Sequence, residues 1–193
     1  RRGGVSGEGL EDARGGREAP RTRVRFSGAH AITGCRGRDA VEGHQGDVTV
    51  GAGDTPPVGG VLTRTAGNRL VGTVDALGDI AIQASYNGET GTVRIGGTTD
   101  QTLTGFANTT TSDMANIVID KASGTLHLVG TIRMLTSSWT WLQVAVDPGT
   151  SSVYFDTTVT ISGTQSLYNV YLSGGAHTVT GGDVLTALGT LTL

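Results

Sequence analysis

Two tryptophans, Trp139 and Trp141, are the residues of this sequence best suited to binding chemistry, and a single threonine separates them. In an extended strand, residues two positions apart point to the same face, so the two indole rings would lie side by side. Such a pair can stack on sugar rings, but large aromatic side chains also pack well in a core. The pair therefore predicts a carbohydrate contact at Trp139 and Trp141 or, as the simpler interpretation, a place in the core.

Carboxylates offer a second chemistry, because glycosidases use paired carboxyl groups to cleave polysaccharides. The candidates that a β-helix could present on an outer face are Asp100, Asp113, Asp156 and Asp183. They are too scattered along the repeat described below to predict an acid–base pair. The sequence also lacks a Gly-x-Ser-x-Gly motif, a phosphate-binding loop and a Cys/His pair. We therefore expect a protein that is not an enzyme.

Metal ligation is a third chemistry that the sequence invites. Asp120 and Asp147 are 27 residues apart, so a repeat of that length would place them about 4.8 Å apart in one column. Such a column could bind Ca²⁺ or, as the simpler interpretation, mark a turn. His127 and His177 have no second ligand at a suitable spacing. The lone Cys35 excludes an internal disulfide and a Cys-based zinc cluster. We therefore expect no metal and no cofactor.

These residues belong to a stretch, Asn116 to Leu193, that repeats itself. Apolar residues recur in it at spacings of 27 and then 26 residues. The four sets are Ile117, Val144 and Val170; Ile119, Val146 and Leu172; Leu126, Val153 and Val179; and Ile132, Val159 and Leu185. A period between roughly 20 and 50 residues indicates stacked units that share one hydrophobic core.

Within each unit, apolar and polar residues alternate over three to five positions, as in Leu126-His127-Leu128. Alternation with a period of two, broken by glycine-containing turns, is typical of short half-buried strands. The sequence therefore predicts an all-β fold, a parallel β-solenoid (β-helix) with coils of about 26–27 residues. The alternative is a β-sandwich of short antiparallel strands, which explains the alternation but not the fixed spacing.

The charge distribution divides the chain. Residues 1–45 hold nine Arg and six acidic residues, whereas residues 46–193 hold an excess of six acids. Residues 1–50 are rich in Arg and Gly and lack an apolar period, so we expect a disordered or non-native segment there. We expect no nucleic-acid binding, because the acids offset the Arg and only Phe26 offers a stacking face. Residues 51–193 form the predicted solenoid, which we expect to continue beyond Leu193.

Several segments carry a resemblance, among them Ala115-Asn-Ile-Val-Ile-Asp-Lys, Gly130-Thr-Ile-Arg and Leu185-Thr-Ala-Leu-Gly-Thr-Leu-Thr-Leu193. They resemble the Thr/Gly-rich repeat regions of large bacterial cell-surface and secreted proteins, similar to adhesin and autotransporter β-solenoids. The resemblance covers roughly residues 68–193.

This resemblance implies a non-enzymatic structural or adhesive segment that is extracellular or lies at the cell surface. It also implies partners among surface glycans or other copies of the same repeat. The alternative function is a carbohydrate-binding or polysaccharide-cleaving β-helix. No apolar run approaches the roughly 18 residues of a membrane span, so we expect no span in this segment.

Overall fold

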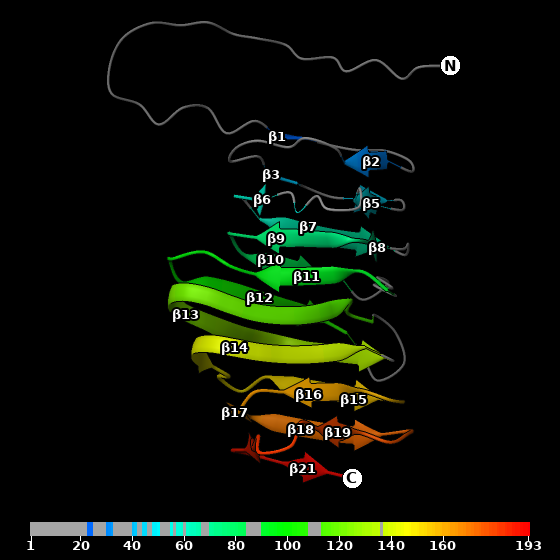
Figure 1. Ribbon diagram of the computed structural model, residues 1–193, viewed down its shortest axis with the longest axis vertical. Coiled ribbons are helices and arrows are strands. Elements are labelled where there is room, and N and C mark those ends of the chain that lie inside the picture. Colours follow the sequence, from blue (N-terminus) through cyan, green and yellow to red (C-terminus); the bar gives the residue numbers. More distant parts are fainter. Residues whose placement is uncertain are drawn as a thin grey trace, which may run out of the picture.

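The computed structural model describes a stack of short β-strands that runs along the long axis of the molecule (Figure 1). The residues described are 23–24, 30–32, 40–41, 44–45, 48–50, 55, 57–59, 61–66, 70–83, 90–107, 113–135 and 137–193. No helix occurs among them, and they form a parallel β-solenoid of about 6 turns. The predicted fold class is thereby confirmed.

The strands are short in the first half of the chain and longer near its middle. In order they are β1 (Arg23–Val24), β2 (His30–Ile32), β3 (Ala40–Val41), β4 (His44–Gln45), β5 (Val48–Val50), β6 (Pro57–Val58), β7 (Leu62–Ala66), β8 (Leu70–Val71), β9 (Thr73–Ala76), β10 (Ile80–Ile82) and β11 (Thr92–Ile95). There follow β12 (Gln101–Phe106), β13 (Asn116–Leu135), β14 (Ser138–Asp147), β15 (Ser152–Asp156), β16 (Thr160–Ser162), β17 (Gln165–Leu167), β18 (Asn169–Ser173), β19 (Thr178–Val179), β20 (Leu185–Ala187) and β21 (Leu191–Thr192).

Three main ladders of parallel strands wrap around the core. The first runs through β6, β9, β11, β13, β14, β16 and β19. The second runs through β4, β7, β10, β12, β13 and β14, and the third through β13, β15, β18 and β21. Every ladder among the described strands is parallel, so the β-sandwich alternative, which needs antiparallel pairs, is wrong.

The predicted coil length and columns were also wrong, because a coil takes about 21 residues rather than 26–27. Ile117 pairs with Trp139 and not Val144, and Ile119 pairs with Trp141 and not Val146. Likewise, Leu126 pairs with Val146 instead of Val153, and Ile132 pairs with Val153 instead of Val159. The turns between strands differ in length, so a constant period matched apolar residues that belong to different ladders.

The core consists of apolar side chains stacked in register along these ladders. In the first ladder they are Val74, Val93, Ile117, Trp139 and Ile161; in the second, Leu62, Ile80, Leu103 and Leu128; in the third, Ile132, Val153 and Val170. All of them are buried. Burying one such side chain is worth roughly 1.5–3 kcal/mol, so the columns are the main source of stability.

Strand β13 turns two corners without leaving the sheet. Its glycines Gly124 and Gly130 both take a φ of 77°, a left-handed conformation that side chains other than glycine rarely adopt. Gly130 also pairs with Gly105 on the neighbouring coil. A Cβ at Gly130 would lie 2.3 Å from the Gly105 carbonyl oxygen, so the close approach of the two coils requires glycine there.

The pairing begins upstream of residue 51. Strand β5 pairs with β2 and with β8, and Val50 at its end is buried in the core with 4% of its surface exposed. The predicted domain boundary at residue 51 thus lies directly after a strand that contributes to the stack.

Candidate functional site

Trp139 lies in the core and presents no ring face to solvent. Its side chain is 0% exposed, and its Nε1–H donates a hydrogen bond of 2.7 Å to Oε1 of Gln165. Its ring meets the Phe155 ring edge-on, with centroids 6.0 Å apart. The core interpretation thus describes Trp139, whose stacking on a sugar would require the coil to open.

Trp141 occupies the same column as Ile119, on the inner face of the first ladder, but it is only half-buried. A Cβ at Gly163 would lie 2.1 Å from the Trp141 carbonyl oxygen, so the backbones approach closely here. The adjacent Leu142 is exposed. The two tryptophans do not form a shared outer platform, and a carbohydrate contact at Trp141 alone stays a prediction.

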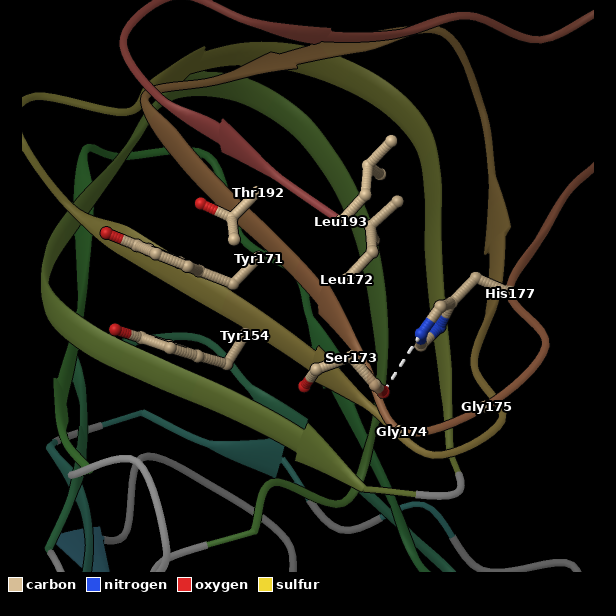
Figure 2. Close-up of a pocket in the computed structure, with 9 residues that line it drawn as sticks. All are labelled: Tyr154, Tyr171, Leu172, Ser173, Gly174, Gly175, His177, Thr192 and Leu193. Atoms are coloured by element: carbon tan, nitrogen blue, oxygen red, sulfur yellow. Dashed lines mark hydrogen bonds between the residues drawn. The ribbon is translucent and has the colours of Figure 1, made fainter.

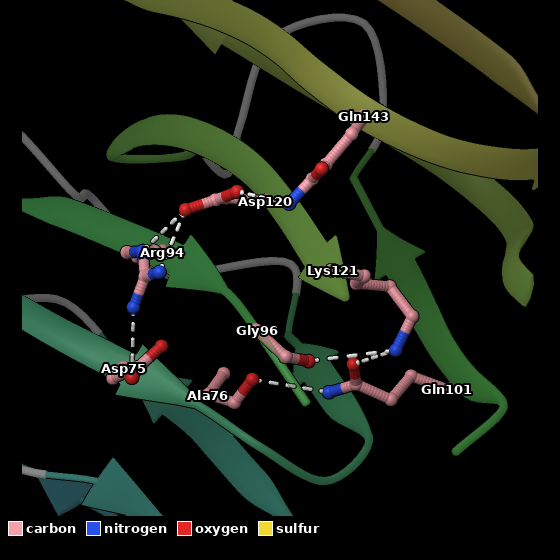
Figure 3. Close-up of polar contacts among 8 residues, drawn as sticks. All are labelled: Asp75, Ala76, Arg94, Gly96, Gln101, Asp120, Lys121 and Gln143. Carbon is pink, nitrogen blue, oxygen red and sulfur yellow. Dashed lines mark hydrogen bonds and ion pairs between the residues drawn. The ribbon is translucent and has the colours of Figure 1, made fainter. Parts of the chain in front are cut away.

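The outer face carries a three-layer ion network in which Arg94 lies between Asp75 and Asp120 (Figure 3). Arg94 Nη2 is 2.6 Å from Asp120 Oδ2, and its Nη1 is 3.1 Å from Asp75 Oδ2. The hydrogen bond from Arg94 lowers the pKa of Asp120, whereas burial raises the pKa of Asp75. The three residues come from β9, β11 and β13, so the network ties three successive coils together.

A second network of the same design surrounds Arg133. Its Nε donates to Asp156 Oδ2 at 2.5 Å, and its Nη1 donates to Asp113 Oδ1. The Arg133 side chain is only 11% exposed. Burial raises the pKa of Asp113, although Arg133 opposes that shift. Ser173 extends the network to a further coil by donating its hydroxyl to Asp156 Oδ1.

The sequence did not predict these networks. The spacing of Asp113 and Asp156 predicts no joint role for them, yet both contact one guanidinium. Within each network, an arginine and its aspartate partners are 19 to 26 residues apart, about one coil. Alternating Asp, Arg and Asp at these spacings was the available signal, and the assumed 26–27-residue period hid it.

The predicted column of Asp120 and Asp147 does not exist, because Asp120 pairs with Gln143 and Asp147 pairs with His127. The geometry for a shared Ca²⁺ site is therefore absent at these two residues. His127 Nδ1 lies 3.1 Å from Asp147 Oδ2 on the exposed face. The backbone N–H of Gly149 and the nearby His127 hold the pKa of Asp147 below its usual value.

Other polar residues singled out from the sequence form hydrogen bonds with backbone groups of neighbouring segments. Asp100 Oδ1 accepts from the backbone N–H of Thr125 at 2.8 Å, and Asp183 Oδ2 accepts from that of Gly163 at 2.7 Å. His177 Nε2 donates to the Ser173 carbonyl oxygen at 3.2 Å. Within the described ranges, no group of three or more His, Cys, Asp or Glu side chains could hold a metal ion.

Inside one corner of the solenoid, Lys121 is buried with only 1% of its surface exposed. Its Nζ donates to the Gly96 carbonyl oxygen at 3.4 Å and to Oε1 of Gln101 (Figure 3). It also donates to the Thr99 carbonyl oxygen at 2.8 Å. Gln101 Nε2 in turn donates to the Ala76 carbonyl oxygen at 3.1 Å. Burial lowers the pKa of Lys121. This interior chain of hydrogen bonds also spans three coils.

The described part of the chain contains a cavity of about 680 Å³ at its C-terminal coil (Figure 2). Its lining includes Tyr154, Tyr171, Leu172, His177 and Thr192. Tyr154 and Tyr171 are partners in the β15–β18 register, and their rings stack with centroids 4.1 Å apart and planes within 4°. Burial, reinforced by Tyr171, raises the pKa of Tyr154.

The described residues include no helix that is both long and apolar enough to pass through a lipid bilayer. Comparison with protein-family models, with curated proteins and with solved structures gave no match to this chain. The fold places the chain in the class of parallel β-solenoids. The proposal below is therefore based on the contacts between its coils.

Proposed function

We propose that this chain is a non-enzymatic structural or adhesive repeat segment of a cell-surface or secreted protein. The observation that carries the proposal is the use of its charged side chains. Arg94 and Arg133 each join three successive coils through carboxylate oxygens. Lys121 binds carbonyl and amide oxygens of the preceding coil, and Gln101 continues that chain of hydrogen bonds to a third coil. Such bracing, added to continuous apolar columns, favours a stiff rod whose length follows from the number of coils.

The resemblance to adhesin-like and autotransporter-like repeats supports the location and role of this rod. An exposed, Thr-rich outer face on a rigid support is suited to contacts with surface glycans or with other copies of the repeat. Both partners, and the extracellular or cell-surface location, are part of the proposal. They share one requirement, which is that the folded solenoid be accessible from outside the cell.

That requirement can be tested with antibodies raised against folded residues 70–193. We expect them to label intact cells of the source organism, or its culture medium, without permeabilisation. Labelling only after permeabilisation would contradict the proposed location.

Incubation with neutral and acidic polysaccharides tests the non-enzymatic role and should release no reducing ends. Turnover that is lost in Asp113→Asn or Asp156→Asn would replace the structural role with an enzymatic one.

The carbohydrate-binding alternative rests on Trp141, which is half-buried beside the exposed Leu142. An indole edge at a corner of the coil can contact the apolar face of a sugar. A glycan array should show binding that is lost in Trp141→Ala and retained in Leu142→Ala. Equal binding by both variants and the parent chain would locate any glycan contact elsewhere.

A further inference from the structure

The stacked tyrosines Tyr154 and Tyr171 suggest chemistry beyond packing. They occupy equivalent positions on β15 and β18, which are paired in parallel and in register. Two identical side chains in this arrangement point the same way, so the two rings lie side by side along the stack. The ring centroids are 4.1 Å apart and the ring planes are within 4° of parallel, so the two rings are in van der Waals contact.

We propose that Tyr154 and Tyr171 form a site of oxidative crosslinking, at which a one-electron oxidant joins two successive coils by a carbon–carbon bond. Each phenol gives up one electron and one proton and becomes a phenoxyl radical. The radicals couple through the ring carbons ortho to oxygen, and the hydrogens on those carbons move to the oxygens as aromaticity returns. The product has lost two hydrogen atoms, and the oxidant has accepted two electrons.

The cavity beside the stack provides access and room for this reaction. Both rings line the space of about 680 Å³ shown in Figure 2, and both side chains are half-buried rather than sealed in the core. Coupling requires the rings to hinge from parallel toward a common edge. Tyr171 can do so because its partner on the next strand is Thr192, which is smaller than an aromatic residue.

Proximity also makes the coupling intramolecular. A radical on one ring meets the other at contact distance, so it reacts before a second molecule arrives at low protein concentration. The chain has four tyrosines. Tyr168 is described but belongs to no stacked pair among the described aromatic contacts, and Tyr86 lies outside the described residues. These two tyrosines provide matched controls.

The test uses the whole chain at low concentration with light, a ruthenium trisbipyridine complex and persulfate, which accepts the two electrons and becomes two sulfate ions. We expect monomeric protein lighter by two hydrogen atoms, with biphenol fluorescence and one linked peptide pair that contains residues 154 and 171. The linkage should disappear in Tyr154→Phe and in Tyr171→Phe and persist in Tyr168→Phe and Tyr86→Phe. Urea should abolish it in the parent chain by separating the coils.

Three outcomes would overturn the proposal. One is folded parent protein, verified by circular dichroism, in which no peptide links residues 154 and 171. Another is linkage that survives in Tyr171→Phe through Tyr168. The third is product that consists only of covalent dimers. Because Tyr→Phe keeps the ring and its packing, loss of the linkage in these variants cannot be attributed to unfolding if their circular dichroism is unchanged.

Discussion

At the scale of single residues, the two arginine networks have the same design, but their arginines differ in exposure. Arg133 is 11% exposed and its partners Asp113 and Asp156 are 14% and 15% exposed, whereas Arg94 is 39% exposed. Charge pairs in contact with water contribute little, while removal of one partner from a buried pair leaves an uncompensated charge. The two networks therefore allow the contribution of a buried arginine to stability to be compared with that of an exposed one.

We predict that Arg133→Met lowers the free energy of unfolding by about 2–4 kcal/mol, because two largely buried carboxylates lose their cation. The matched change Arg94→Met should lower it by about 1 kcal/mol. Urea titrations followed by circular dichroism would measure both. Equal effects of the two substitutions would contradict the assignment of Arg133 as the stronger brace.

Lys121 gives a prediction for alkaline pH. Burial lowers its pKa in the folded protein below the ordinary 10.5, so between those two values the unfolded chain binds more protons than the folded one. Stability contributed by Lys121 therefore rises with pH in that window. The unfolding free energy of the parent chain minus that of Lys121→Met should therefore increase from neutral pH toward 10.5. A difference that stays constant or shrinks would contradict a lowered pKa.

At the scale of strands, the sequence predicted the kind of element but not the register. Alternation around His127 correctly indicated strands with one face in the core, and the recurrence of apolar residues at a regular spacing correctly indicated that the strands stack in parallel. The predicted columns failed because they contain aliphatic residues alone. Trp139, for which the sequence left a core position and a carbohydrate contact open, fills the column of Ile117 and Ile161. Corner lengths depend on which backbone turns fit between coils, and apolar spacing alone does not encode them.

The observed register can be tested with engineered disulfides in a Cys35→Ser background. Val118 pairs with Thr140 and Thr125 pairs with Ala145, so each pair has Cα atoms about 5 Å apart, within the range of a disulfide. Val118→Cys with Thr140→Cys should therefore crosslink under mild oxidation, as should Thr125→Cys with Ala145→Cys. The pair Val118→Cys with Ala145→Cys, which a 27-residue coil would place together, should stay reduced. Crosslinking of that last pair alone would restore the longer coil.

At the scale of the whole molecule, each coil of the stack pairs with the coils directly before and after it. In such repeat architectures, stability is approximately a sum of coil and interface terms. Removing a coil from one end should then weaken the protein without unfolding the remaining coils. The Asp–Arg–Asp networks and the tyrosine stack form only when coils are superposed, so the sequence predicts them only once the length of each coil is known.

Deletion from the N-terminus tests this additivity. Val50 is the first buried side chain in the part of the chain whose side chains the structure describes. A chain that starts at Val48 keeps Val50 and the buried residues that follow it, so it should unfold near the same urea concentration as the full chain. A chain that starts at Thr73 loses the buried Val50, Val58, Leu62 and Leu70. It should unfold at lower urea but keep its β-sheet circular dichroism. Complete loss of structure in the longer chain would show that residues 1–47 are needed for folding.

The unequal coils have a consequence for how such a chain can change over time. Register partners are 17 residues apart at Val153 and Val170 but 25 apart at Leu103 and Leu128. The same apolar columns thus tolerate a difference of eight residues per coil, all of it absorbed at the corners. In genetic terms, small in-frame insertions and deletions at corners should be close to neutral, whereas insertion or deletion of an odd number of residues inside a strand would turn the inward side chains that follow it outward. The outer surface of this solenoid can therefore diversify rapidly while its core is inherited unchanged.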